Sequence, residues 1–158
     1  MAPFLFTQAL MQDRPIPLFN HGRMQRDFTY VDDLVNAIRA LMDVVPHHRV
    51  IPVAGDSLSP VAPWRVVNIG NGAPVPLTAF IDAFQQATGR IARVPMLPMQ
   101  PGDVAATWAD TSLLDRLTGP RVPTPLAVGL ARYVDWFARY CEAGPRTAES
   151  MPQRLGAA

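Results

Sequence analysis

The sequence predicts an α/β fold, because segments with helical spacing alternate along the chain with short β-prone segments. Apolar residues three and four positions apart mark the helices, which are expected at residues 4–11, 32–45, 78–88, 110 or 111 onward, and 125–140. The strands are expected at residues 16–19, 65–69 and 91–96. So few strands cannot build a doubly wound sheet alone.

The first elements are short and are bounded by turn residues. The helical repeat over residues 4–11 ends near Asp13, before Pro15, which cannot continue a helix. The apolar strand over residues 16–19 then leads into a turn, where Gly22 can adopt a positive φ without the steric penalty of a Cβ.

The next helix, over residues 32–45, follows a β-prone segment at residues 28–30. Asp32 or Asp33 is expected to cap it, because a carboxylate accepts the free backbone N–H groups of a first turn. Pro46 ends it. Its apolar residues lie on one face that is expected to be buried, namely Leu34, Val35, Ile38, Leu41, Met42 and Val45.

A loop, a strand and a helix are expected next. Residues 46–63 are rich in proline and predict a surface loop, after which the strand at residues 65–69 returns to the sheet. Thr78 is expected to cap the helix over residues 78–88, with Gly89 as its C-terminal stop. The inward side chains of that helix should be Phe80, Ile81 and Phe84.

The C-terminal part contains two further helices. Asp110 or Thr111 opens a brief one, and Thr124 and Pro125 are the expected cap and first residue of the last one. We therefore expect one folded region over residues 1–143, whereas the composition of residues 144–158 predicts a disordered tail.

Composition excludes several classes of protein. With 49% hydrophobic and 17% charged residues, the 158-residue chain is expected to be globular. The net charge is +1, and all fourteen basic residues are scattered arginines, so we expect no nucleic-acid partner.

The cysteine and histidine content gives no metal site. A single cysteine, Cys141, excludes an internal disulfide and is expected to be a small packing residue in the last helix. His47 and His48 are expected in a surface loop. No apolar segment approaches the length of a membrane span, and the apolar start lacks a basic leader, so we expect a cytoplasmic protein with no membrane contact.

Four segments carry a resemblance to a known family. They are Phe19-Asn20-His21-Gly22 with Arg26-Asp27-Phe28-Thr29-Tyr30-Val31-Asp32-Asp33, then Val67-Asn68-Ile69-Gly70-Asn71, then Leu97-Pro98-Met99-Gln100-Pro101-Gly102-Asp103-Val104, and Thr107-Trp108-Ala109-Asp110. Their order, from Met1 to about Tyr140, resembles the C-terminal half of the extended short-chain dehydrogenase/reductases, and of the NAD-dependent UDP-glucuronate 4-epimerases in particular.

The resemblance implies a fold with elements of two domains. The helix at residues 32–45 and the strand at residues 65–69 would be incomplete elements of the Rossmann domain, and the other pieces would build the small α/β substrate-binding domain. Separated from the rest of that Rossmann sheet, these two elements would expose apolar faces, which predicts marginal stability or association through them.

The resemblance also implies a UDP-sugar site. Arg26 is similar to the arginine that contacts the diphosphate, a role that suits its forked donors. Pro17, Leu18 and Phe19 would hold the uracil, and Asp103 would accept hydrogen bonds from the ribose hydroxyls. Gln100 stands where related galactose epimerases have an arginine, so any ligand contact there would be a neutral hydrogen bond.

Structural alternatives exist for these residues. Arg26 could form a surface salt bridge to Asp27 or Asp32, Phe19 could equally belong to the core, and Asp103 could cap a helix or turn. The residue types and spacings alone leave these alternatives open.

Two features of the family are missing from the sequence. Its catalytic pair is Tyr-x-x-x-Lys, and this chain has no lysine. The nearest match to the glycine-rich NAD loop is Gly70-Asn71-Gly72, but Val75 stands where a third glycine is needed, so an ordinary turn is the better interpretation.

The expected function is therefore that of a UDP-sugar-binding C-terminal portion of an NAD-dependent epimerase that interconverts UDP-glucuronate and UDP-galacturonate. In that family NAD removes and returns a hydride at C4 of the sugar. This chain is expected to be inactive alone, with an N-terminal half or a second copy as a candidate partner. The alternative is a non-enzymatic remnant or nucleotide-binding module from a truncated gene.

Overall fold

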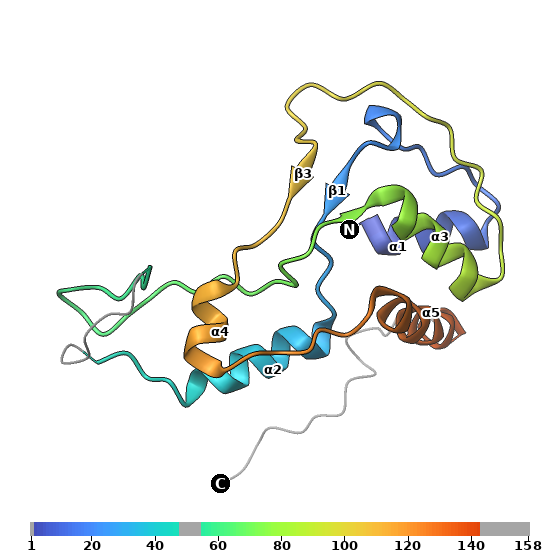
Figure 1. The fold of residues 1–158 in the computed structure, drawn as a ribbon. Coiled ribbons are helices and arrows are strands. Elements are labelled where there is room, and N and C mark those ends of the chain that lie inside the picture. Colours follow the sequence, from blue (N-terminus) through green and yellow to red (C-terminus); the bar gives the residue numbers. More distant parts are fainter. Residues whose placement is uncertain (1, 48–54, 143–158) are drawn as a thin grey trace, which may run out of the picture.

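The computed structural model describes residues 2–47 and 55–142 and arranges them as two groups of helices linked by a small sheet (Figure 1). The first group contains α1 (Ala2–Met11), α3 (Leu77–Thr88) and α5 (Leu126–Glu142). The second contains α2 (Val31–Met42) and α4 (Ser112–Thr118). The expected tail at residues 144–158, His48 and part of the expected loop lie outside the described residues.

The sheet is mixed and very short, which confirms the α/β class. Its three strands are β2 (Val75–Pro76), β1 (Gln25–Arg26) and β3 (Ala106–Thr107), in the order β2-β1-β3. β1 pairs antiparallel with β2 and parallel with β3, where Arg26 is in register with Thr107. β1 follows a 3-10 turn, η1 (Asn20–Gly22), in which Gly22 has the expected positive φ of 76°.

The segments expected to be strands at residues 16–19 and 91–96 lie side by side without forming regular strands. Leu18 donates its N–H to the Pro95 carbonyl at 3.0 Å and accepts from the Leu97 N–H at 2.8 Å, which makes one isolated parallel bridge. The Ile16 N–H donates to Arg93 O at 2.8 Å, but the next rung would need an N–H at residue 95. Because proline has none, Pro95 interrupts the ladder at this rung.

The strand expected at residues 65–69 is wrong, and the β-prone segment at residues 28–30 does not form a strand either. Neither segment has a strand partner in the described part of the chain, and Val66 is 63% exposed. The Ser57 hydroxyl, rather than a neighbouring strand, accepts the Val66 N–H at 3.0 Å. A strand needs a neighbouring strand to pair its backbone groups, and residues 65–69 have no such neighbour among the described residues.

Two expected caps are also wrong. α2 begins at Val31 with Tyr30 at the N-cap position, so Asp32 and Asp33 lie inside its first turn. α3 begins at Leu77, so Thr78 lies inside that helix. The Asp33 carboxylate instead accepts bonds from Thr124 N–H at 2.7 Å and from its hydroxyl at 2.9 Å, which fixes α2 next to the start of α5.

The core lies between α1, α3 and α5, with residues 16–18 against it. Phe80, Ile81 and Phe84 are buried as expected, and Phe84 has no exposed surface. Phe80 stacks on Phe28 with ring centroids 3.9 Å apart. Gly89 ends α3 in the left-handed conformation with φ 65°, also as expected.

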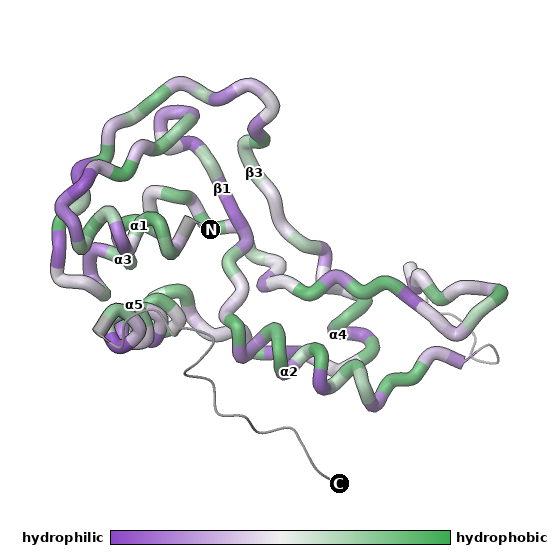
Figure 2. The backbone as a smooth tube through the Cα atoms, turned by 180° about the vertical axis from the view of Figure 1, so that it is seen from behind, coloured by the Kyte–Doolittle hydropathy of each residue, from purple (hydrophilic) through white to green (hydrophobic). Residues whose placement is uncertain are grey.

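The expected burial of the α2 face is wrong for this chain. Only Ala37 of α2 is buried, whereas Val35 is 52%, Ile38 48% and Met42 71% exposed. Figure 2 shows hydrophobic segments along this helix, which packs against α4. Cys141 is exposed rather than packed. Among the described residues, no helix is both long and apolar enough to cross a membrane.

Candidate nucleotide-sugar site

The structure brings together two residues that the sequence predicts as site residues. Arg26 Nη2 donates to Asp103 Oδ1 at 3.2 Å, and Arg26 Nη1 donates to the backbone carbonyls of Gln25 at 2.7 Å and Ala105 at 3.4 Å. The alternative partners of Arg26, Asp27 and Asp32, do not pair with it. The Arg26 and Asp103 side chains are 29% and 32% exposed, so a ligand can reach both.

Asp103 lies in a turn that precedes β3. Its N–H donates to the Gln100 carbonyl at 3.2 Å, and Oδ1 also accepts the Val104 N–H at 3.1 Å. Asp103 is therefore a turn residue and an ion-pair partner at once. Gln100 is exposed, and its backbone carbonyl, rather than its side chain, holds the turn.

The remaining predicted residues differ in burial. Leu18 is 1% exposed and belongs to the core cluster, whereas Pro17 is exposed. Phe19 is half-buried, and its carbonyl accepts the Gly22 N–H at 3.0 Å. Within the described residues, no hydrogen bond or ion pair joins residues 17–19 to Arg26 or Asp103.

Asp27 is an important residue that the sequence analysis did not single out. Its carboxylate accepts backbone N–H groups from Asn71 at 3.1 Å, Gly72 at 3.0 Å and Ala109 at 3.3 Å. A side chain at Gly70 would meet this group, since an added Cβ would lie 2.7 Å from Asp27 Oδ2 and 2.6 Å from Ala109 Cβ. The one sequence feature that could have pointed to Asp27 was the glycine-rich turn at residues 70–72, which contacts its carboxylate.

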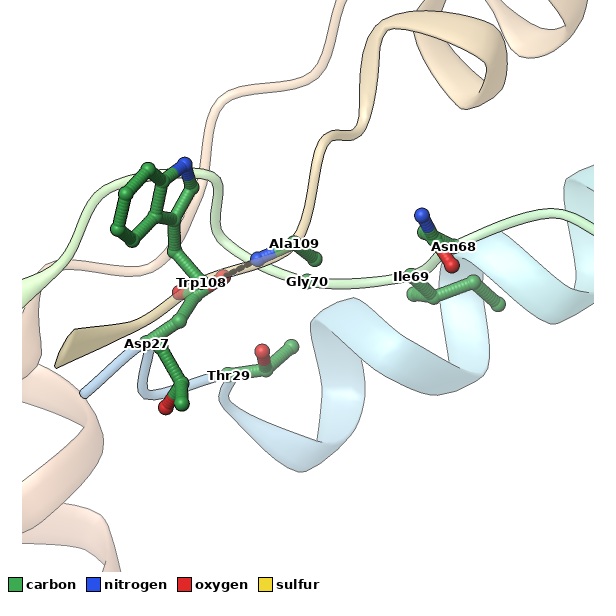
Figure 3. Close-up of a pocket in the computed structure, with 8 residues that line it drawn as sticks. Asp27, Thr29, Asn68, Ile69, Gly70, Trp108 and Ala109 are labelled. Atoms are coloured by element: carbon green, nitrogen blue, oxygen red, sulfur yellow. Dashed lines mark hydrogen bonds between the residues drawn. The ribbon is translucent and has the colours of Figure 1, made fainter. Parts of the chain in front are cut away.

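A small cavity of about 370 Å³ lies beside Asp27 (Figure 3). It is widely open to solvent, and Trp108, one of its lining residues, is 61% exposed. Its lining residues come from three segments and are Asp27, Thr29, Asn68, Ile69, Gly70, Thr107, Trp108 and Ala109.

A larger, mainly apolar groove of about 740 Å³ lies between α1, α5 and the segment that precedes α2. Tyr30 lines it, and the Arg132 guanidinium lies 5.5 Å from the centre of that ring. The groove also contains Tyr133, whose hydroxyl is buried without a hydrogen-bond partner. Burial raises the pKa of Tyr133.

The Gly70–Gly72 turn does not fit the pyrophosphate of NAD. A dinucleotide loop offers free backbone N–H groups to the phosphates, but those of Asn71 and Gly72 are already bonded to the Asp27 carboxylate. A second anion there would also be repelled by that carboxylate. Over residues 2–47 and 55–142, no group of three acidic, histidine or cysteine side chains could hold a metal ion.

The Thr107-Trp108-Ala109-Asp110 segment leads into α4, which begins at Ser112 with Thr111 at the N-cap position. Asp110 Oδ1 accepts the Ser112 N–H at 2.9 Å, and this bond is the main reason why the pKa of Asp110 lies below its usual range. Of the two residues expected to open this helix, Thr111 lies at the N-cap position, and Asp110, one residue earlier, accepts the N–H of the first helical residue.

Known proteins with similar sequences belong to one family of nucleotide-sugar enzymes or resemble it. Residues 1–54 match the NAD dependent epimerase/dehydratase family. The chain is 48% identical over 140 residues to a probable UDP-glucuronate 4-epimerase of Rhizobium meliloti, which covers 87% of this chain and 41% of the relative. It is 33% identical over 152 residues to UDP-glucuronate 4-epimerase 4 of Arabidopsis thaliana, covering 94% of this chain and 34% of that relative.

Solved structures show the same fold. The Bacillus cereus UDP-glucuronic acid 4-epimerase, in complex with UDP-glucuronic acid and NAD, superimposes with a TM-score of 0.68 at 24% identity, over 88% of this chain and 40% of that one. MoeE5 in complex with UDP-glucuronic acid and NAD gives a TM-score of 0.68 at 25% identity, with 88% and 42% covered.

Fold and sequence together thus relate this chain to the NAD-dependent epimerases/dehydratases of the extended short-chain dehydrogenase/reductase class, and it aligns with their C-terminal part. Within that class, the particular proteins that it resembles are the UDP-glucuronate 4-epimerases. The chain spans about two fifths of the length of the curated bacterial relatives that it matches, 41% in the Rhizobium meliloti protein.

Proposed function

We propose that this chain binds the nucleotide part of a UDP-sugar, as the substrate-binding C-terminal portion of a protein resembling UDP-glucuronate 4-epimerase. The observation that carries this proposal is the meeting of Arg26 and Asp103 at 3.2 Å, at an accessible position. Both residues stand in segments that resemble the family's, and a cation beside a hydroxyl-binding carboxylate suits a nucleoside diphosphate.

Each candidate residue contacts a different part of the UDP-sugar in this proposal. Arg26 donates to the diphosphate, for which a guanidinium is better suited than an ammonium because its donors form a rigid fork. Asp103 holds the guanidinium in place and accepts from the ribose hydroxyls. Residues 17–19 contact the uracil through backbone groups and the Phe19 ring, and the exposed Gln100 contributes a neutral hydrogen bond.

We also propose that the chain does not interconvert UDP-glucuronate and UDP-galacturonate by itself. The sequence holds no lysine for a Tyr-x-x-x-Lys pair, and the amides of its glycine-rich turn are bonded to Asp27. Catalysis would need a second polypeptide that supplies the cofactor loop and the acid/base pair.

Titration calorimetry tests the proposed site. UDP and UDP-glucuronate should each release or absorb heat with the wild-type chain, and the Arg26→Ala variant should lose this signal. Arg90→Ala is the matched control, because Arg90 is exposed just after the C-terminal end of α3 and forms no ion pair among the described residues. Absence of heat in the wild-type protein would overturn the proposal and favour a non-enzymatic remnant.

Turnover is a separate question with a separate assay. Incubation with NAD and UDP-glucuronate should give no UDP-galacturonate by chromatography of the nucleotide sugars. Formation of the product by the purified chain would contradict the proposed inactivity while leaving the binding site intact.

A further inference from the structure

Three segments of the chain meet at the carboxylate of Asp27, directly after β1. Asn71 and Gly72 donate to it from the turn before β2, and Ala109 donates from the segment after β3. Figure 3 shows Asp27 beside Gly70 and Ala109, between these segments. In the described residues no arginine or histidine forms an ion pair with Asp27, so backbone N–H groups alone compensate its charge there.

The sheet needs such a contact because its own hydrogen bonds are few. Each strand has only two residues, and β1 is held to β3 by the bonds from Gln25 N–H to Ala105 O at 2.8 Å and from Asp27 N–H to Thr107 O at 3.1 Å. A slip of one residue would turn each side chain to the opposite face of the sheet. Bonds from Asp27 to both flanking segments oppose that slip.

The register fixed in this way determines the proposed diphosphate site. Arg26 immediately precedes Asp27, and consecutive side chains of a strand point to opposite faces. Ala109 follows β3, so its bond to Asp27 ties the end of β3 to the end of β1, the strand that contains Arg26. Asp27 has no bond to Arg26 in the described structure, so it acts on Arg26 through the backbone of β1.

The turn is shaped around the carboxylate. Gly70 approaches so closely that a Cβ there would lie 2.7 Å from Asp27 Oδ2 and 2.6 Å from Ala109 Cβ. Distances below about 3 Å are far inside van der Waals contact, so any side chain at residue 70 would displace Asp27 or Ala109. Gly70 thus offers a second, independent way to disturb the same contact.

We propose that Asp27 is a positioning residue, which holds the Arg26 guanidinium in the geometry that binds a nucleoside diphosphate. Asp103, the proposed ribose contact, is held separately by the bonds of its own turn to Gln100 and Val104. The inference rests on the proposed UDP site and adds a residue that does not touch the ligand. Its consequence is selective: loss of the Asp27 carboxylate weakens the contact with the diphosphate and leaves the contact with the nucleoside unchanged.

The test compares UDP with uridine in the Asp27→Asn variant. The amide keeps the shape of the side chain but replaces one acceptor oxygen with an NH2 group, which cannot accept the backbone N–H groups that bond the carboxylate. We expect the Kd for UDP to rise on the order of tenfold. The Kd for uridine, measured by ligand-observed NMR, should stay within about twofold, because uridine lacks the diphosphate that Arg26 contacts. Asp82→Asn is the control, since Asp82 is exposed on α3 and bonds only Gln85.

Each outcome decides the inference. Equal loss of UDP and uridine binding would show a general folding defect and overturn it, as would unchanged binding of both. If Asp27→Asn does not fold, Gly70→Ala is judged by the same ratio of UDP to uridine. If the wild-type chain does not bind UDP, the proposed function itself is overturned. If wild type and variant bind UDP equally, only the role of Asp27 is overturned.

Discussion

Arg26 Nη2 and Asp103 Oδ1 lie 3.2 Å apart although 77 positions separate the two residues in the sequence. Their side chains are about one third exposed, and an isolated pair of this kind contributes little to folding stability. Its significance is geometric, because Asp103 and the Ala105 carbonyl hold the guanidinium where its remaining donors can meet an anion.

The Arg26→Lys variant should separate geometry from charge. It keeps the positive charge but loses the planar fork, so we expect UDP affinity to fall on the order of tenfold, compared with about a hundredfold for Arg26→Ala. The melting temperature of both variants should stay close to that of the wild type. Equal UDP affinity of Arg26→Lys and wild type, by calorimetry, would show that only charge matters at this position.

Phe84 should be among the residues on which stability depends most. It has no exposed surface and contacts Phe80 and Tyr133 edge to face. Phe84→Ala is expected to lower the free energy of unfolding by about 3–5 kcal/mol, through lost apolar burial and a new cavity. Val122→Ala, at a side chain that is 95% exposed, should change it by less than about 0.5 kcal/mol in urea denaturation. Equal effects of the two variants would mean that this core is not formed.

Tyr133→Phe should stabilise the chain. The Tyr133 hydroxyl is buried without a partner, while the nearby Thr7 hydroxyl donates to Pro3 O at 2.9 Å. Removing an unsatisfied buried hydroxyl is expected to raise the free energy of unfolding by about 1 kcal/mol at pH 7. Tyr140→Phe, in an exposed ring on the same helix, is the control and should have little effect.

The gain from Tyr133→Phe should also increase in alkali. Because burial raises the pKa of Tyr133 in the folded chain, the unfolded chain loses this proton first as the pH rises. The free energy of unfolding of the wild-type chain is therefore unaffected by this proton below the unfolded pKa of about 10 and falls above it, whereas the Tyr133→Phe variant has no such loss. Urea denaturation between pH 8 and 11 should show the gap between the two proteins widening from about pH 10; a constant gap would contradict this assignment.

The sequence predicted the helices better than the strands, for physical reasons. A helix satisfies its hydrogen bonds internally, so the spacing of Phe80, Ile81 and Phe84 was enough to predict both α3 and its buried face. A strand is completed by its neighbours. Residues 65–69 have strand-like composition but no paired edge, and Pro95 interrupts the pairing of residues 16–18.

The site was predictable in part. Arg26 and Asp103 were found because their sequence segments resemble a known family, but their mutual contact depends on the β1–β3 register, which two-residue strands do not reveal in a sequence. Asp27 was missed because its partners are backbone N–H groups, and such partners leave no side-chain signature. The helix caps failed for a related reason, since Asp33 bonds Thr124 rather than its own helix.

The apolar face of α2 should make the isolated chain associate. Val35, Ile38 and Met42 are each about half exposed or more, on one side of a single helix, and contiguous apolar surface of this kind favours contact with another surface. Light scattering should therefore give a mass above 17.3 kDa that rises with concentration. The triple variant Val35→Gln, Ile38→Gln and Met42→Gln should remain at the monomer mass, because its surface no longer gains from burial. Val122→Gln, which removes an isolated exposed valine, should associate as the wild type does. A wild-type chain that stays monomeric at all concentrations would show that this face is tolerated in water.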